Sequence, residues 1–113
     1  DLLRSRGLGD VYKRQSNMFE DASLFNQPIG NWDVSNVENM YSMFDGALVF
    51  NQDISSWDVF NVNGMANMFY NAETFNQDIS NWDVSSVTNC SEFSIGSTSW
   101  TLPQPNFTNC NPN

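Results

Sequence analysis

The sequence predicts a repeat solenoid of mixed α/β type, in which each 25-residue coil contributes one short helix and one short strand. Three observations predict it: motifs recur at a spacing of 25 residues, no insertion interrupts the repeats, and apolar residues follow helical and strand periodicities within each copy. A unit of this size cannot bury its own apolar face, so neighbouring units are expected to stack.

The repeat is defined by residues that recur in three copies. The first motif is Met-Phe, the second Phe-Asn-Gln and the third Trp-Asp-Val. The copies of the first two are Met18-Phe19, Met43-Phe44 and Met68-Phe69, then Phe25-Asn26-Gln27, Phe50-Asn51-Gln52 and Phe75-Asn76-Gln77. The copies of the third begin at Trp32, Trp57 and Trp82. Because the spacing never changes, every unit is expected to have the same shape.

Two segments of each unit predict its secondary structure. Val37, Met40, Phe44 and Ala47 are spaced by 3, 4 and 3 positions, which places them on one stripe of a short helix. The segment 57–59 alternates apolar, polar and apolar residues, as a very short strand with one face inward does.

The repeat divides the chain into three parts. Residues 1–15 do not fit it, and residues 10–15 resemble the translation of a transposon-end adapter, so a non-native scar is expected there. The alternative is a natural basic arm that pairs with the acidic body. If the segment is a scar, the chain is a fragment that begins in mid-repeat. Residues 16–89 are three tandem repeats, and residues 90–113 are a degenerate fourth repeat and C-terminal cap, where three prolines oppose another coil.

The charge of the chain is divided unevenly. All four basic residues lie within positions 1–15, whereas residues 16–113 contain eleven of the thirteen acids and no Lys or Arg, which gives that stretch a charge of −11. Duplex nucleic acid and anionic membranes would be repelled, so no nucleic-acid partner is expected. No apolar run is long enough for direct membrane insertion.

The repeat resembles a known family. Units of the form Met-Phe-x-x-Ala-x-x-Phe-Asn-Gln-x-Ile-x-x-Trp-Asp-Val, from about Asn17 to Val87, resemble the BspA-like leucine-rich-repeat surface proteins, and more closely the branch first noted in mycoplasma lipoproteins. The segment 105–110 is similar to the terminal cap of that branch. The resemblance implies a right-handed leucine-rich-repeat-like solenoid, an extracellular or cell-surface location, and a role in adhesion or partner binding without catalytic residues.

The recurring aspartates Asp33, Asp58 and Asp83 are candidate metal ligands. If consecutive coils stack as strands do, these carboxylates lie about 5 Å apart and could hold Ca²⁺ through oxygen ligands. The alternative is structural, with each carboxylate accepting hydrogen bonds from turn amides. No other cofactor is expected.

Other columns are candidates for a binding surface. The asparagines are expected to form an internal amide ladder. The adjacent glutamines should then point outward, as should residues at positions that vary between units. The candidate binding residues are therefore Gln27, Gln52, Gln77, Asp53, Asp78, Tyr41 and Tyr70. The variable positions also include the slot of Gly30, Ser55 and Ser80 and the slot of Asn31, Ser56 and Asn81.

The two cysteines lie outside the regular repeats. Cys90 replaces a methionine of the repeat and Cys110 lies twenty residues later, which indicates a disulfide that closes the cap, with two free thiols as the alternative. A metal site is disfavoured with two Cys and no His.

The chain offers little for catalysis, since it contains no His and its repeats contain no Lys. The sequence predicts a non-enzymatic cell-surface module that presents one face to a protein or glycan partner. A structural stalk and a Ca²⁺-dependent adhesive array are the alternatives. An open N-terminal face bearing Met18, Phe19 and Phe25 is expected to favour self-association.

Overall fold

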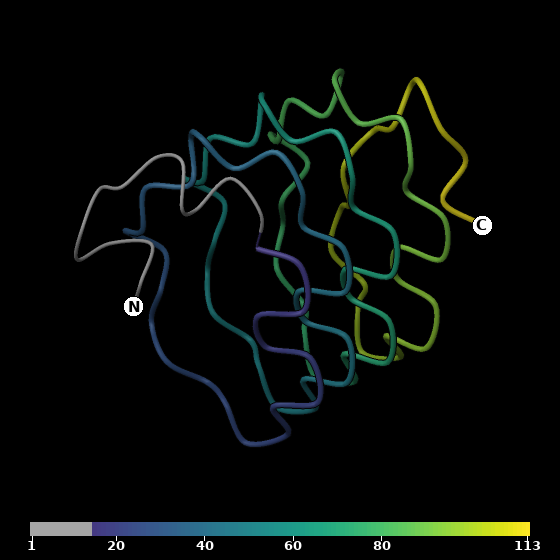
Figure 1. The fold of residues 1–113 in the computed structure, drawn as a ribbon. Helices are drawn as coiled ribbons and strands as arrows, with labels where there is room; N and C mark the ends of the chain where they lie inside the picture. Colours follow the sequence, from purple (N-terminus) through teal and green to yellow (C-terminus); the bar gives the residue numbers. More distant parts are fainter. Residues whose placement is uncertain (1–14) are drawn as a thin grey trace.

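The computed structural model describes residues 15–113, whose backbone passes through successive loops that lie against one another from the N- to the C-terminal end (Figure 1). This part of the chain contains no α-helix and no extended strand. Two isolated parallel bridges join Asn39 to Gly64 and Gly64 to Asn89, each across a step of one repeat. The elements are otherwise turns and loops.

The predicted α/β solenoid with one helix and one strand per unit is therefore wrong, and so is the leucine-rich-repeat-like architecture. Residues 15–113 have no helix and almost no strand, and the molecule is a compact body with extents of 35 × 32 × 20 Å. No helix in residues 15–113 is long and apolar enough to cross a membrane.

Hydrogen bonds between units take the place of a helix. The backbone N–H groups of Met40, Ser42, Phe44 and Gly46 donate to carbonyl groups 24 positions later, over 2.8 to 3.0 Å. The same slots donate in the units before and after, at Gln15, Asn17, Phe19 and Asp21 and at Met65, Asn67, Phe69 and Asn71. Because alternate N–H groups bond to the next unit, they are not available for bonds to carbonyls four positions earlier, which a helix requires.

Two left-handed backbone positions in each unit complete the break from a helix. One slot contains Asn17, Ser42, Asn67 and Glu92, with φ between 54° and 62°, and the other contains Asp21, Gly46, Asn71 and Gly96, with φ between 56° and 82°. Asn, Asp and Gly tolerate this conformation better than other residues do. Four of the eight positions hold Asn or Asp and two hold Gly, so the chain reverses direction locally instead of forming a helix.

The apolar stripes nevertheless point inward as their periodicity predicts. Val37, Met40, Phe44 and Ala47 are each at most 1% exposed. Trp57 and Val59 are buried on either side of the exposed Asp58. The periodicity thus predicted burial correctly and secondary structure incorrectly.

Aromatic rings form columns through the core at the spacing of the units. The Phe44 ring stacks against Phe19 and Phe69, with centroid distances of 5.5 and 5.3 Å. Trp57 and Trp82 stack at 6.3 Å, and their indole N–H groups donate to the carbonyls of Ile29 and Ile54 in the preceding units. Both of these buried indoles therefore have a hydrogen-bond partner, as buried tryptophans usually do.

The C-terminal residues pack over the last repeat. The Phe107 ring contacts Phe93 edge to face at 4.9 Å, and the carbonyl of Pro103 accepts the N–H of Ile79. The predicted scar or arm at residues 1–15 lies outside the described residues except for Gln15. That residue is buried and donates its backbone N–H to the Asn39 carbonyl.

Candidate functional site

The asparagine column is a ladder that joins the units. Asn26 Oδ1 accepts the backbone N–H of Asn51, and Asn51 Oδ1 accepts that of Asn76, over 3.0 and 2.8 Å. The last rung is made by Asn76, whose Oδ1 accepts the N–H groups of Thr101 and Leu102 in the cap. These side chains accept hydrogen bonds from backbone N–H groups that, in the absence of a β-sheet, have no backbone partner among residues 15–113.

Two of the three candidate glutamines also bind this ladder. The Nε2 groups of Gln52 and Gln77 donate to both the carbonyl and the Oδ1 of the asparagine one unit earlier, over 2.9 to 3.2 Å. Both side chains are half-buried, while Gln27 is exposed. The carbonyl partners determine the amide orientation: the nitrogen of Gln77 faces Asn51, which leaves its Oε1 for other contacts.

The aspartate column consists of three separate turns. Asp33, Asp58 and Asp83 are exposed, and the Oδ1 of each accepts the backbone N–H two residues later, over 3.0 to 3.1 Å. Hydrogen bonds from the hydroxyl and the N–H of Ser35 lower the pKa of Asp33, and Ser85 lowers the pKa of Asp83 in the same way. Each carboxylate therefore builds its own loop, as Asx turns do.

Asp53 and Asp78 build the same kind of turn on a different edge of the units. Asp53 accepts the N–H of Ser55 and Asp78 accepts that of Ser80, over 2.9 and 3.0 Å. The serine hydroxyl and backbone bonds lower the pKa of both carboxyl groups. Both are consequently anions at neutral pH, held in fixed orientation by their own loops.

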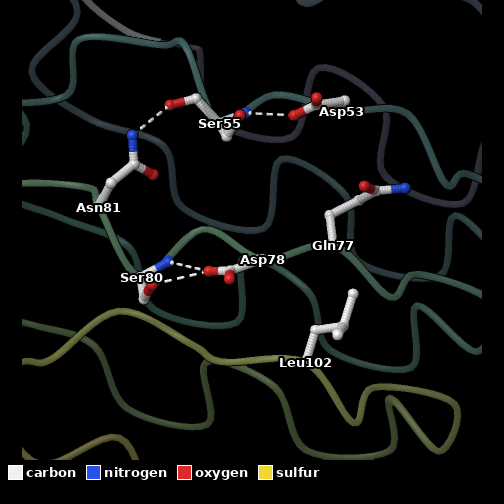
Figure 2. Close-up of a pocket in the computed structure, with 7 residues that line it drawn as sticks. All are labelled: Asp53, Ser55, Gln77, Asp78, Ser80, Asn81 and Leu102. Carbon is white, nitrogen blue, oxygen red and sulfur yellow. Dashed lines mark hydrogen bonds between the residues drawn. The ribbon is translucent and has the colours of Figure 1, made fainter.

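These two turns line an open depression of about 430 Å³ on the surface (Figure 2). Its wall is formed by residues of two consecutive repeats and the cap: Asp53, Ser55, Gln77, Asp78, Ser80, Asn81 and Leu102. Asn81 crosses between repeats, because its Nδ2 donates to the Ser55 carbonyl over 2.9 Å. Leu102 supplies the one apolar side chain of the lining and is 43% exposed.

The depression unites two of the predicted binding columns and omits others. Gln77, Asp53 and Asp78 lie in it, whereas Gln27, Gln52, Tyr41 and Tyr70 do not line it. Leu102 was not among the predicted residues. The signal for it was available, since adding 25 to Gln77 gives Leu102, which places the cap residue in the glutamine slot.

The candidate tyrosines are half-buried. Tyr41 lies across Gly64, where a Cβ atom would meet the ring at 2.5 Å, and its hydroxyl accepts a hydrogen bond from Asn89 Nδ2 over 3.4 Å. The Tyr41 side chain thus extends over the following unit, at Gly64, and contacts Asn89 in the unit after that. Met18, Phe19 and Phe25, the predicted N-terminal face, are partly buried against the core.

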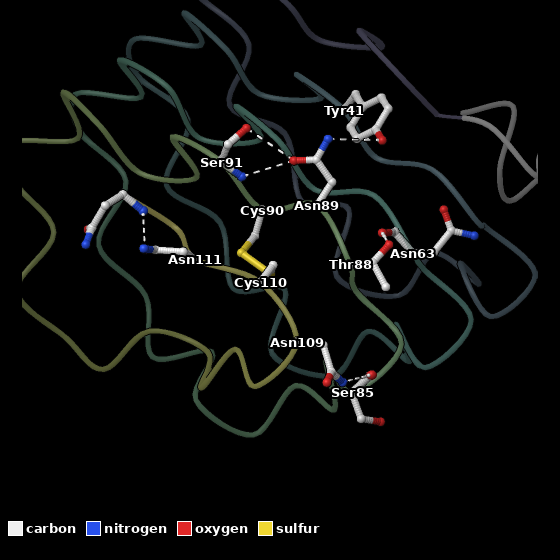
Figure 3. The surroundings of a disulfide bond; sticks show 11 residues. Tyr41, Asn63, Ser85, Thr88, Asn89, Cys90, Ser91, Asn109, Cys110 and Asn111 are labelled. Carbon is white, nitrogen blue, oxygen red and sulfur yellow. Dashed lines mark hydrogen bonds between the residues drawn. A yellow bond between two sulfur atoms is a disulfide. The ribbon is translucent and has the colours of Figure 1, made fainter.

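Cys90 and Cys110 form a disulfide that ties the C-terminal segment to the last repeat (Figure 3). The Cys90 side chain is fully buried, and Asn109, next to Cys110, donates through Nδ2 to the Ser85 carbonyl. Closing a loop of 20 residues contributes about 3 kcal/mol of stability in the chain-entropy description. The disulfide therefore holds the C-terminal cap against the core.

The chemistry of the described residues is that of hydrogen-bond acceptors and anions. Residues 15–113 contain no Lys, Arg or His, and they contain no group of three or more Asp, Glu, Cys or His side chains placed to hold a metal ion. The carboxylates of the depression have lowered pKa values, so they are poorly suited to donate a proton near neutral pH. Their arrangement suits recognition of a ligand.

Comparison with known proteins adds a family. No curated protein and no solved structure matches the chain. The resemblance to mycoplasma repeats is supported by a family match over residues 10–104, while the finer resemblance to BspA-like leucine-rich repeats has no such support. The chain therefore belongs to the family described as "Mycoplasma protein of unknown function, DUF285".

Proposed function

We propose that this chain is a non-catalytic interaction module at the cell surface, and that it binds a protein or glycan partner through the depression between Asp53 and Asp78. The observation that carries this proposal is where the variable residues lie. The framework columns are occupied by packing and by the asparagine ladder. The lining of the depression combines Gln77 of the repeated Phe-Asn-Gln motif with residues from slots that differ between units.

The first repeat shows how specific this lining is. Its residues in the slots of Asp53, Ser55 and Ser56 are Pro28, Gly30 and Asn31. It therefore lacks a carboxylate where the second and third repeats each have one. A doubly anionic depression arises at one step of the stack, as expected of a binding site and not of a uniform spacer.

Two observations support an extracellular location. The Cys90–Cys110 disulfide is of a kind that persists in oxidising compartments and is rare in the cytosol. Membership of a mycoplasma repeat family fits a surface-type protein. A structural stalk is the alternative, and it would need no specific lining at any step.

A matched pair of variants tests the proposal. Wild-type chain, Leu102→Lys and Leu24→Lys are applied to a panel of immobilised glycans and extracellular proteins. The first substitution adds bulk and a cation to the depression, and the second makes the same change at a leucine that is 86% exposed elsewhere. Binding should be lost in Leu102→Lys and retained in Leu24→Lys.

The other outcomes are equally informative. Equal loss in both variants would show that binding does not use the depression. A wild-type chain that binds no member of the panel would favour the stalk, since a spacer needs no partner.

A further inference from the structure

We infer that the depression between Asp53 and Asp78 recognises a basic side chain, the guanidinium of an arginine or the ammonium of a lysine in a partner peptide. This inference rests on the proposed interaction function and narrows its partner to a cationic protein segment. It follows from which polar atoms of the lining already form hydrogen bonds within the protein and which do not.

Most side-chain donors of the lining are already engaged in hydrogen bonds within the protein. Gln77 Nε2 donates twice, to the carbonyl and the Oδ1 of Asn51. Asn81 Nδ2 donates to the Ser55 carbonyl, and the Ser80 hydroxyl donates to Asp78 Oδ1 over 2.7 Å. The hydroxyl of Ser55 is hydrogen-bonded to Asp53. One N–H of Asn81 is the sole side-chain donor of this lining left over.

The remaining polar atoms of the lining are acceptors. Among the described residues, Asp53 Oδ2, Asp78 Oδ2, Gln77 Oε1 and Asn81 Oδ1 accept no hydrogen bond. Figure 2 shows these side chains around one opening. A ligand group that fills this opening must therefore supply several donors and few acceptors.

Lysine and arginine meet this requirement, since the ammonium has three donors, the guanidinium five, and neither has an acceptor. Sugar hydroxyls both donate and accept, so they would leave their own acceptors facing carboxylates. Two anionic groups add a charge that only a cation complements, and residues 15–113 contain no Lys, Arg or His to neutralise them.

Leu102 completes the match. It lies at the edge of the depression and is 43% exposed. Basic side chains cover apolar surface with their methylene stems while the charged end stays with polar groups. The lining thus offers apolar surface for the stem at Leu102, and carboxylate and amide oxygens for the charged head.

The test uses the full chain, labelled with ¹⁵N, and three small probes. Nα-acetyl-arginine amide and Nα-acetyl-lysine amide carry the cation, and Nα-acetyl-citrulline amide has nearly the shape of the arginine probe without its charge. The side-chain amide signals of Gln77 and Asn81 are followed in NMR titrations. Shifts at these two residues are expected with the cationic probes, and half-saturation with citrulline should need at least about tenfold more ligand.

Two double variants provide matched controls. D53N/D78N removes both charges from the depression but keeps an oxygen acceptor in each turn, as Asn89 does for Ser91 elsewhere in the chain. D33N/D83N makes the same change in the other pair of turns. The first should weaken binding of the cationic probes at least about tenfold, and the second should change it less than about twofold.

A further variant replaces Arg4, Arg6, Lys13 and Arg14 with glutamine, so that the chain's own cations cannot compete with the probes. Equal weakening by D53N/D78N and D33N/D83N would overturn the inference, because binding would then reflect overall charge. Citrulline binding as strongly as arginine would overturn it too. If the depression binds a glycan of the panel but neither cationic probe, the interaction function stands and the inference falls.

Discussion

At the scale of single residues, substitutions in one unit are compensated in the next. Tyr41 is the one tyrosine in its slot, where Ser16, Ala66 and Ser91 stand in the other units. Gly64 is likewise the one glycine in a slot that holds Asn39 and Asn89. The Tyr41 ring occupies the space that a Cβ at position 64 would need. The two departures from the repeat therefore form a pair.

This pairing predicts a coupled effect on stability. Gly64→Ala places a Cβ within 2.5 Å of the Tyr41 ring, so it should lower the free energy of unfolding by about 1–3 kcal/mol. Tyr41→Ser restores the serine of the other units and makes room. In the double variant Gly64→Ala should cost much less. Chemical denaturation of the four proteins measures the coupling, and additive costs would show that the ring does not depend on the glycine.

The charges of Asp45 and Asp33 are expected to have opposite effects on the stability of the folded protein. Burial raises the pKa of Asp45, and the neighbouring Glu20 and Asp21 raise it further, so its anion destabilises the native state at neutral pH. Asp45→Asn should therefore raise the melting temperature at pH 7. The difference in melting temperature between variant and wild type should be absent below the ordinary aspartate pKa of 3.8. It should grow as the pH rises from there through the higher pKa of Asp45 in the folded protein.

Asp33→Asn is the control for that experiment. Hydrogen bonds from Ser35 lower the pKa of Asp33, so its anion stabilises the native state above pH 3.8, and this contribution is lost as the pH falls through the folded pKa. The asparagine variant should melt no higher than wild type at pH 7. A rise in both variants would indicate general charge repulsion and not the local surroundings of Asp45.

At the scale of the unit, ladders of side-chain hydrogen bonds join consecutive units, as backbone hydrogen bonds join the strands of a β-sheet. Asn51 alone accepts the N–H of Asn76 and two bonds from Gln77 through its carbonyl and Oδ1. The step from one unit to the next therefore depends on an amide at this slot. The sequence indicated this ladder by the identical spacing of its asparagines.

Asn51→Ala should lower the free energy of unfolding by about 1–3 kcal/mol, because it leaves the Asn76 N–H and one Gln77 donor without their acceptor. Asn31→Ala is the control, since Asn31 is exposed and makes no hydrogen bond among the described residues. Its effect should stay within about 0.5 kcal/mol. Equal effects would mean that the ladder contributes nothing beyond what any surface asparagine does.

The helix prediction failed at this scale for a physical reason. Spacings of 3 and 4 report which side chains face inward, and those side chains are indeed buried. They do not report where the backbone N–H groups go, and here alternate groups bond to the next unit. Asn17, Asp21, Asn67 and Asn71, at left-handed positions, were a signal against a helix, because one slot recurs in the middle and the other near the end of the supposed stripe.

The site was predictable in part. Asp53, Asp78 and Gln77 were identified because they stand at variable or outward slots. Their convergence with Leu102 was not, since it depends on how the cap follows the third repeat. Gln52 shows a further limit: strand alternation placed it outward, yet it is half-buried on the ladder because no strand exists there.

At the scale of the whole molecule, the acidic residues are spread along the units and do not form a cluster that could hold a metal ion in residues 15–113. Residues 15–113 carry seven Asp and four Glu without a cation, yet no three of these groups come together as ligands. The column Asp33, Asp58 and Asp83 divides into three turns, each with its own hydrogen bonds.

Millimolar Ca²⁺ should therefore leave the melting temperature where NaCl of equal ionic strength leaves it. A dissociation constant above about 10 mM limits the gain at 1 mM ion to about 0.1 kcal/mol or less. Thermal unfolding followed by circular dichroism, with a chelator in parallel, measures this. A rise with Ca²⁺ that is abolished by D33N/D83N would restore the aspartate column as a metal site.

One set of backbone hydrogen bonds always runs forward: the slots of Met40, Ser42, Phe44 and Gly46 donate their N–H groups to the next unit. The asparagine ladder and the tryptophan indoles donate in the opposite direction, to the preceding unit. The forward set gives the stack two different ends, and it recurs at each junction from the first unit to the cap. Excising residues 40–64 would remove Tyr41 together with Gly64 and bring the donors of the first unit opposite the carbonyls of the third. Loss of this block would keep the forward hydrogen bonds but remove Asp53, and with it the depression. Duplication of the block would lengthen the stack and leave a copy of Asp53 beside Asp78.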